Sequence, residues 1–206
     1  MTHGFFPDDP PGEDEDPVAQ SYERVPSFEP PRDEVPALFA ASEVIARGDD
    51  LVIAISGARV HSDGVEILID RHLRRGSRDA REWQLAQMDF TGHLGGGERS
   101  PDRLRWGLVL GNGERLFLED RFAPPSPVDP STDDVVRHSV HMTGGGGGGG
   151  GETYTMHDGL WLHPLPPEGP LELVVQWPAF GVPESRVILD GGAMSALAAS
   201  VRPLWG

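Results

Sequence analysis

The chain has 206 residues, enough for one globular domain with some additional segments. Its 17 basic residues are all Arg, its 33 acidic residues bring the formal net charge to −16, and it contains no Lys and no Cys. Without Lys there is no Walker-type phosphate loop and no Schiff-base amine, and without Cys there is no disulfide, thiolate nucleophile or Cys-ligated zinc. The charge argues against binding to nucleic acid or to an anionic membrane surface.

Residues 1–36 are acidic and rich in proline. They hold ten acidic residues against Arg24 and Arg32, together with eight prolines. Low hydrophobicity and self-repulsion predict a disordered acidic tail, which either only solvates the protein or binds a basic partner protein. The segment lacks the basic start and apolar run of a secretory leader, and no stretch approaches the roughly 18 apolar residues of a membrane span, so we expect a cytoplasmic protein.

From residue 37 onward, apolar residues alternate with polar ones between turn sequences, which is typical of antiparallel strands. The segments Leu38–Arg47, Leu51–His61 and Val65–Arg74 predict a meander, with Ser62-Asp63-Gly64 as its hairpin turn. The middle segment is apolar on both faces: Leu51, Ile53 and Ile55 lie on one face, and Val52, Ala54 and Ala58 on the other. The third segment directs Val65, Ile67 and Ile69 inward and Glu66, Asp70, His72 and Arg74 outward.

The middle of the chain predicts a long connection and a second hairpin. Ser77–Met88 has the spacing of a short helix, with Trp83 and Ala86 on one side, within the connection Gly76–Ser100. Arg103–Leu110 and Arg115–Leu118 then flank a turn around Gly111-Asn112-Gly113.

The last third predicts further strands and one helix. Val135–Met142 is expected to be a strand, the glycine run Gly144–Gly151 a flexible loop or linker, and Glu152–His163 a hairpin turning at Asp158-Gly159. Leu171–Trp177 and Ser185–Leu189 are expected strands, and Asp190 is expected to cap an amphipathic helix that ends near Arg202. The whole pattern predicts an all-β fold, an antiparallel β-sandwich of about eight to ten strands with a C-terminal amphipathic helix, over residues 37–206.

Histidines offer one route to catalysis. The chain has eight, of which His138, His141, His157 and His163 could combine with carboxylates into a metal site for a hydrolase. No HExxH or similar spacing supports such a site, so ordinary surface histidines are the simpler interpretation.

A nucleophilic triad is a second route. Asp70 and His72 share the outward face of one strand, which resembles the base half of a triad. No G-x-S-x-G sequence supplies the nucleophile, and Ser56, Ser139 and Ser185 have no distinguishing context. The solvated face of a strand explains the same residues, and we assign no catalytic, metal or cofactor-binding residue.

The most distinctive local sequence is the block from Trp177 to Arg186. Pro178 and Pro183 bracket a rigid corner that holds Phe180 and presents Glu184 and Arg186. Trp177, Phe180, Glu184 and Arg186 are therefore the candidate interaction surface, although a corner that packs one sheet on the other would have the same sequence. Core packing is the simpler interpretation for the strand tryptophans Trp106 and Trp161, and also for Trp177, which lies on the apolar stripe of its strand.

The chain resembles a group of uncharacterised actinobacterial proteins in three places. These are the meander Glu43–Leu73, the glycine-rich break before Gly159–Pro166, and Trp177–Arg186 with a closing helix that ends near Trp205. The resemblance implies no activity, so it assigns no role to any residue. We expect a non-enzymatic binding or interaction module with a protein partner and no cofactor, and the histidine- and carboxylate-dependent hydrolase is the alternative.

Overall fold

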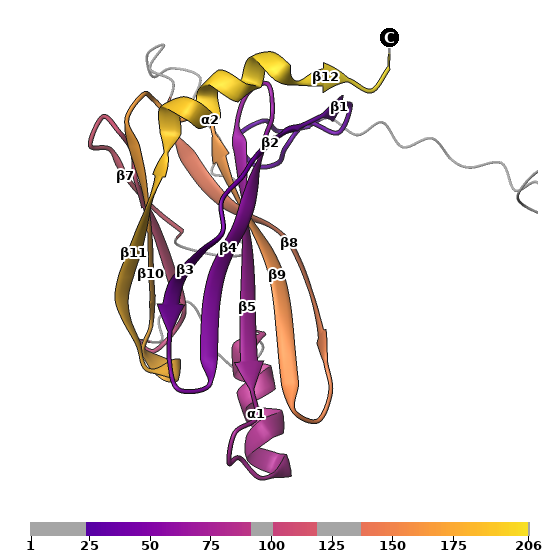
Figure 1. Ribbon diagram of the computed structural model, residues 1–206, viewed down its shortest axis with the longest axis vertical. Helices are drawn as coiled ribbons and strands as arrows, with labels where there is room; N and C mark the ends of the chain where they lie inside the picture. Colours follow the sequence, from indigo (N-terminus) through magenta and orange to yellow (C-terminus); the bar gives the residue numbers. More distant parts are fainter. Residues whose placement is uncertain (1–23, 92–100, 119–136, 206) are drawn as a thin grey trace, which may run out of the picture.

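The computed structural model describes residues 24–91, 101–118 and 137–205, and these form a mainly β protein with antiparallel sheets. The larger sheet has six strands in the order β2-β4-β5-β9-β8, with β3 also paired to β4 (Figure 1). Its strands are β2 (Ala37–Phe39), β3 (Glu43–Arg47), β4 (Leu51–Val60), β5 (Val65–Arg74), β8 (Ser139–Gly149) and β9 (Thr153–His163).

The smaller sheet has four strands in the order β11-β10-β6-β7. They are β6 (Arg105–Val109), β7 (Arg115–Phe117), β10 (Pro170–Trp177) and β11 (Val182–Asp190). A short pair joins β1 (Glu34–Val35) to β12 (Arg202–Pro203). The helices are α1 (Ala80–Phe90) and α2 (Gly191–Leu197), with single 3₁₀ turns η1 (Pro178–Phe180) and η2 (Ala198–Ser200).

Both helices begin at side-chain caps. Asp79 forms a capping box with Glu82 at the start of α1. Asp190 accepts a hydrogen bond from the Ala193 backbone at the start of α2, which is the cap that the sequence predicted. Trp83 is buried, which agrees with the predicted inner side of α1. Within the described part of the chain, no helix is long and apolar enough to cross a membrane.

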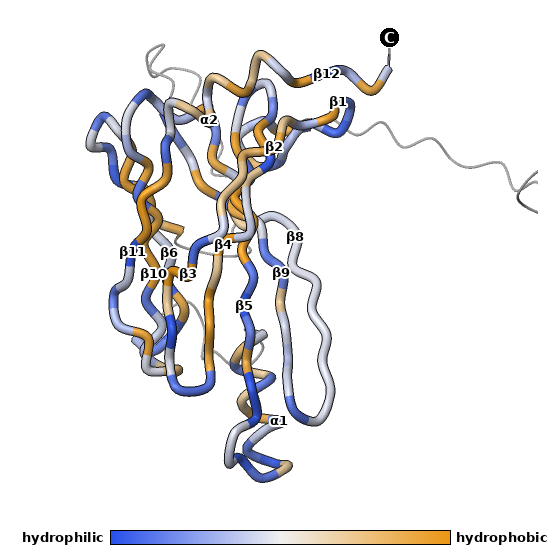
Figure 2. Tube along the Cα trace, in the orientation of Figure 1, coloured by the Kyte–Doolittle hydropathy of each residue, from blue (hydrophilic) through white to orange (hydrophobic). Residues whose placement is uncertain are grey.

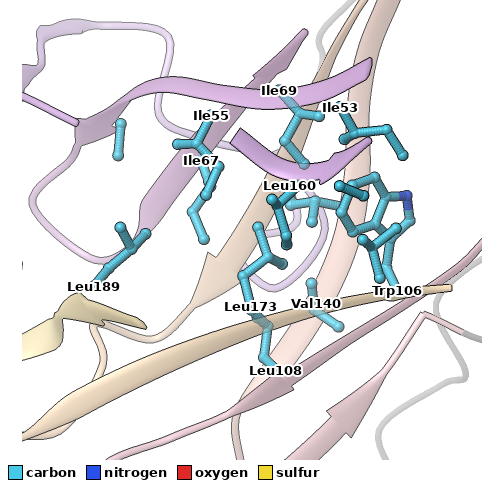
Figure 3. Packing of buried hydrophobic residues seen from close by; sticks show 14 of the residues in the cluster. Ile53, Ile55, Ile67, Ile69, Trp106, Leu108, Val140, Leu160, Leu173 and Leu189 are labelled. Carbon is cyan, nitrogen blue, oxygen red and sulfur yellow. The ribbon is translucent and has the colours of Figure 1, made fainter. Parts of the chain in front are cut away.

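One hydrophobic cluster takes its residues from both sheets. Isoleucines and leucines of β4, β5 and β9 face Trp106, Leu108 and Leu173 of the smaller sheet (Figure 3). The predicted alternation of β5 is confirmed, because Val65, Ile67 and Ile69 are buried. The hydropathy of the chain follows the same pattern, with apolar stretches in β4 and β10 and a hydrophilic tip on the hairpin of β8 and β9 (Figure 2).

The inward face of the larger sheet also carries a buried ion pair. Arg71 of β5 is 1% exposed and its Nε donates to Asp158 Oδ2 of β9 at 2.5 Å, and the carboxylate is fully buried. A second guanidinium nitrogen donates to the Phe90 carbonyl at the end of α1, at 2.7 Å. The guanidinium carbon lies 5.0 Å from the Phe90 ring centre and 5.3 Å from that of Trp177, so one cation ties both sheets to α1.

Three local predictions were wrong for reasons that the tertiary structure supplies. Asp158-Gly159 is not a turn, because β9 runs unbroken through it and Asp158 pairs with Arg71. A bulge between Ile55 and Gly57 rotates β4, so Ala58 lies on the same buried face as Ile55 and not opposite to it. The sequence predicted a disordered tail up to residue 36, but residues 24–36 are folded against the larger sheet. Residues 1–23 lie outside the described chain.

The glycine run is also not a loop over its whole length. Gly144 to Gly149 belong to β8, Gly146 to Gly149 pair with β9, and only residues 150–152 form the turn. The register shifts between Thr143 and Gly146, where Gly144 and Gly145 have φ of 65° and 131°, values that favour glycine. The hairpin tip is held to α1, because Trp83 Nε1 donates to the Gly150 carbonyl at 3.3 Å.

We expect removal of either buried charge to be strongly destabilising. Asp158→Asn or Arg71→Met leaves an uncompensated buried group, so the free energy of unfolding should fall by about 3–5 kcal/mol, whereas the double variant R71M/D158L should recover most of the loss. Urea denaturation followed by circular dichroism measures the change. Arg81→Met on the exposed side of α1 is the matched control. A loss below about 1 kcal/mol in both single variants would contradict the role assigned to the pair.

Neighbouring glycines of β8 should respond oppositely to alanine. At Gly147 a Cβ would lie 2.6 Å from the Thr155 carbonyl and against the Met156 sulfur, whereas at Gly148 it would meet nothing within 4 Å. We expect Gly147→Ala to lower the free energy of unfolding by roughly 1–3 kcal/mol through this crowding. Gly148→Ala should raise it by about 0.5–1 kcal/mol, because glycine loses more backbone entropy on folding. Thermal denaturation of the two variants measures the difference. Equal shifts in melting temperature would show that the glycine run behaves as a loop.

Candidate binding surface

The predicted interaction surface divides between the core and the exterior. Trp177 is only 3% exposed and lies nearly parallel to the Phe90 ring, with ring centres 5.6 Å apart. Phe180, half-buried in η1, packs edge-on against Trp177 at 4.5 Å. Pro178 begins η1 and Gly181, with φ of 67°, reverses the chain after it, so this corner packs aromatic rings inward. Trp177 therefore provides core packing and not a contact surface.

Glu184 and Arg186 do lie on the exterior, both on β11. The Arg186 guanidinium donates to Glu184 at 2.5 Å and to Glu172 of β10 at 3.1 Å. The hydrogen bond and charge of Glu184, with those of Glu172, raise the pKa of Arg186, so it stays charged. These side chains belong to the outer face of the four-stranded sheet.

Cross-strand register shows what this outer face contains. One row runs Phe117, Gly107, Val174 and Arg186, and the next runs Arg115, Val109, Glu172 and Ile188. Phe117 is 66% exposed and Ile188 62% exposed, which is unusual for large apolar side chains. Apolar and basic side chains are thus combined on one face of an acidic protein.

Gly107 lies at the floor of a groove on this face. Because glycine has no side chain, a hollow of about 360 Å³ remains over β6, and Phe117, Val174 and Arg105 are among the residues that line it. Arg105 is positioned by the Gln176 side chain and the Pro101 carbonyl at 3.3 Å and 3.0 Å. We define the outer groove as Arg105, Gly107, Arg115, Phe117, Val174 and Arg186.

The four candidate metal-binding histidines do not converge. His138 pairs with Glu114 at 2.7 Å, His157 with Asp70 at 2.6 Å, and His163 lies 3.9 Å from Asp63. His141 instead packs on the Phe28 ring, 5.0 Å away. Among the described residues, no three His, Asp or Glu side chains are grouped as a metal site requires.

The proposed base half of a triad is also rearranged. Asp70 pairs with His157 on the neighbouring strand, whereas His72 faces Thr155, with 3.3 Å between His72 Nδ1 and Thr155 Oγ1. Strand register decides this, because Asp70 lies directly opposite His157. Ser56 lines the same shallow depression as this pair, while the hydroxyls of Ser139 and Ser185 donate to backbone carbonyls.

The sequence-based reasoning missed two features. The first is the outer groove, for which no role was assigned to Arg105, Gly107, Arg115 and Phe117. These residues alternate along two predicted strands with the inward-facing Trp106 and Leu116, so the alternation could have placed all four on the outer face. Trp161 was expected in the core and is fully buried, but it lies on the outer face of β9, where its indole nitrogen donates to the Pro26 carbonyl. No local pattern in the sequence indicates that contact.

Comparisons with known proteins assign no relationship: no family model, no curated protein and no solved structure matches this chain.

Proposed function

We propose that the protein is a non-enzymatic interaction module, and that it binds an extended, acidic and apolar segment of a partner protein in the outer groove. The observation that carries the proposal is the exposure of Phe117 beside the glycine floor at Gly107. A large exposed aromatic next to an unfilled hollow is the kind of anchor that protein partners use.

The charges of the groove suggest the chemistry of the partner. Arg105 and Arg115 are exposed at the groove, and Arg186 closes it with Glu172 and Glu184 beside it. Guanidinium groups bind carboxylates through paired hydrogen bonds. A strand-like segment directs alternate side chains to the same face, so acidic residues at alternate positions could reach these arginines together. An apolar side chain of the same segment would occupy the hollow above Gly107.

The proposal also includes a β-sandwich architecture and a likeness to uncharacterised actinobacterial proteins. We infer that the two sheets are the halves of an antiparallel β-sandwich, which the hydrophobic cluster common to both supports. Such a scaffold holds a binding face rigid and leaves it open to solvent. The likeness to uncharacterised actinobacterial proteins in the Trp177–Arg186 block stays a proposal and transfers no activity.

Synthetic peptides test the groove directly. An eight-residue peptide alternating Glu with Leu should bind the full chain by fluorescence anisotropy, and a peptide with Lys in place of Glu should not. Gly107→Leu should weaken binding at least tenfold, because a new side chain fills the hollow; a Cβ there meets only ordinary contacts, the nearest 3.5 Å away. Arg115→Glu should weaken it by a similar factor through charge repulsion.

Matched variants elsewhere on the surface control for general stickiness. Leu38, 74% exposed on β2, is the counterpart of Phe117, so Leu38→Ala should leave binding unchanged while Phe117→Ala weakens it. Arg81→Glu on α1 is the counterpart of Arg115→Glu. Equal binding of the Glu and Lys peptides, or binding that survives Gly107→Leu, would disprove the proposal.

A further inference from the structure

Residues 24–34, which we call the strap, cross the outer face of the larger sheet and cover Trp161. The indole Nε1 donates to the Pro26 carbonyl at 2.9 Å, and Ser139 Oγ donates to the Ser27 carbonyl at 3.1 Å. Trp161 is fully buried although it belongs to the outward-facing side of β9. The strap therefore contributes to the burial of this aromatic ring, together with His61 and His163 beside it.

An ion pair anchors the start of the strap. Both terminal nitrogens of Arg24 donate to the two carboxylate oxygens of Asp63, at 2.9 Å and 3.2 Å. The same guanidinium lies 6.0 Å from the Trp161 ring centre. The far end is held by Glu34, whose Oε1 accepts from the Ser62 backbone at 2.8 Å.

Three histidines lie beneath or beside this strap. His61 stands edge-on to Trp161 with ring centres 5.5 Å apart, and its Nδ1 lies 3.1 Å from Glu34 Oε1. His163 lies 6.3 Å from the same indole ring, and His141 packs on Phe28 of the strap. Such clustering of titratable rings under one segment couples its position to proton binding.

The hydrogen bonding of His61 shows the direction of that coupling. A glutamate carboxylate can only accept, so Nδ1 is the donor in this contact, and in the neutral ring Nε2 then carries no proton. That Nε2 is buried and has no hydrogen-bond partner in the described chain. A second proton on Nε2 would therefore bury a charged donor without an acceptor, which is costly unless the strap moves away.

We propose that the strap is an acid-released latch: proton uptake by His61, His141 and His163 at mildly acidic pH lifts residues 24–34 from the sheet and exposes Trp161. This inference does not depend on the proposed function of the outer groove, which lies on the other sheet.

Burial, more than the surrounding charges, sets this direction for all three histidines. Burial lowers the pKa of His61 despite the nearby carboxylates of Glu34, Glu66 and Asp63, which act to raise it. Burial alone lowers the pKa of His141. Burial also lowers that of His163, where Arg24 and His138 add to the effect and Asp63 opposes it.

The sign of the pH dependence follows from these lowered values. The closed state binds fewer protons than the open one, so it is favoured above a pH of about 6.5, the ordinary value for an exposed histidine. As the pH falls below that value, each histidine shifts the ratio of open to closed strap by up to about tenfold per pH unit, until its own lowered pKa is reached. Three histidines acting together would give a steep opening.

Spin labels can measure the opening, because the chain has no cysteine of its own. Pulsed electron paramagnetic resonance then reports the distance between the strap and the sheet. The labels are attached at Val25→Cys, 43% exposed on the strap, and at Leu38→Cys, 74% exposed on β2. We expect one narrow distance at about pH 7.5 and a broad, longer distribution at about pH 5.5. Labels at Leu38 and Ile188, both exposed on the sheets, should give the same distance at both pH values and so exclude general unfolding.

Variants assign the effect to the three histidines. The triple variant H61Q/H141Q/H163Q cannot take up these protons, so its strap should remain closed at about pH 5.5. His61→Gln alone should make the opening of the strap depend less steeply on pH. If circular dichroism shows that the triple variant is unfolded, this single variant tests the latch instead. His157→Gln is the matched control, since His157 is an exposed histidine of the same sheet paired with Asp70, and it should open like the unaltered chain.

A last variant tests the anchor. Asp63→Asn removes the partner of Arg24, so the strap should open at a higher pH than in the unaltered chain. An unchanged distance distribution between the two pH values, or the same opening in the His61→Gln chain as in the unaltered one, would overturn the latch.

Discussion

The buried pair of Arg71 and Asp158 is the constraint on which the arrangement of this protein depends. A guanidinium and a carboxylate removed from water are tolerated only when each is paired closely, so β5 and β9 must lie side by side in one register. The bond to the Phe90 carbonyl extends the same requirement to the end of α1, and the nearby Trp177 ring extends it to the smaller sheet. One cation thus fixes elements that are distant in the sequence.

The two outer faces differ because different parts of the chain cover them. On the larger sheet, residues 24–34 pack on Trp161, and His61 and His141 contact this segment at Glu34 and Phe28. On the smaller sheet, Phe117 and Ile188 remain exposed within the described chain, and Gly107 leaves a hollow between strands. We propose a response to protons for the first face and the binding of an extended segment for the second.

Much of the β structure follows from alternation alone. Local patterns were sufficient for the bounds of β4, β5 and β10, for the turn at Asp63-Gly64 and for the cap at Asp190, because these depend on neighbouring residues. The same local logic failed at Asp158-Gly159, because a turn-favouring pair lies in mid-strand when a distant arginine needs its carboxylate. It also failed at Gly146 to Gly149, where pairing with β9 outweighs the entropy that glycine loses on folding.

The sequence by itself determined an antiparallel β protein with a C-terminal helix, and it correctly directed Glu184 and Arg186 outward. It could not place Gly107 in a groove, and it could not pair Asp70 with His157. These outcomes depend on which strands become neighbours and in which register. Register is set by long-range packing between residues separated by dozens of positions, and no local pattern encodes it.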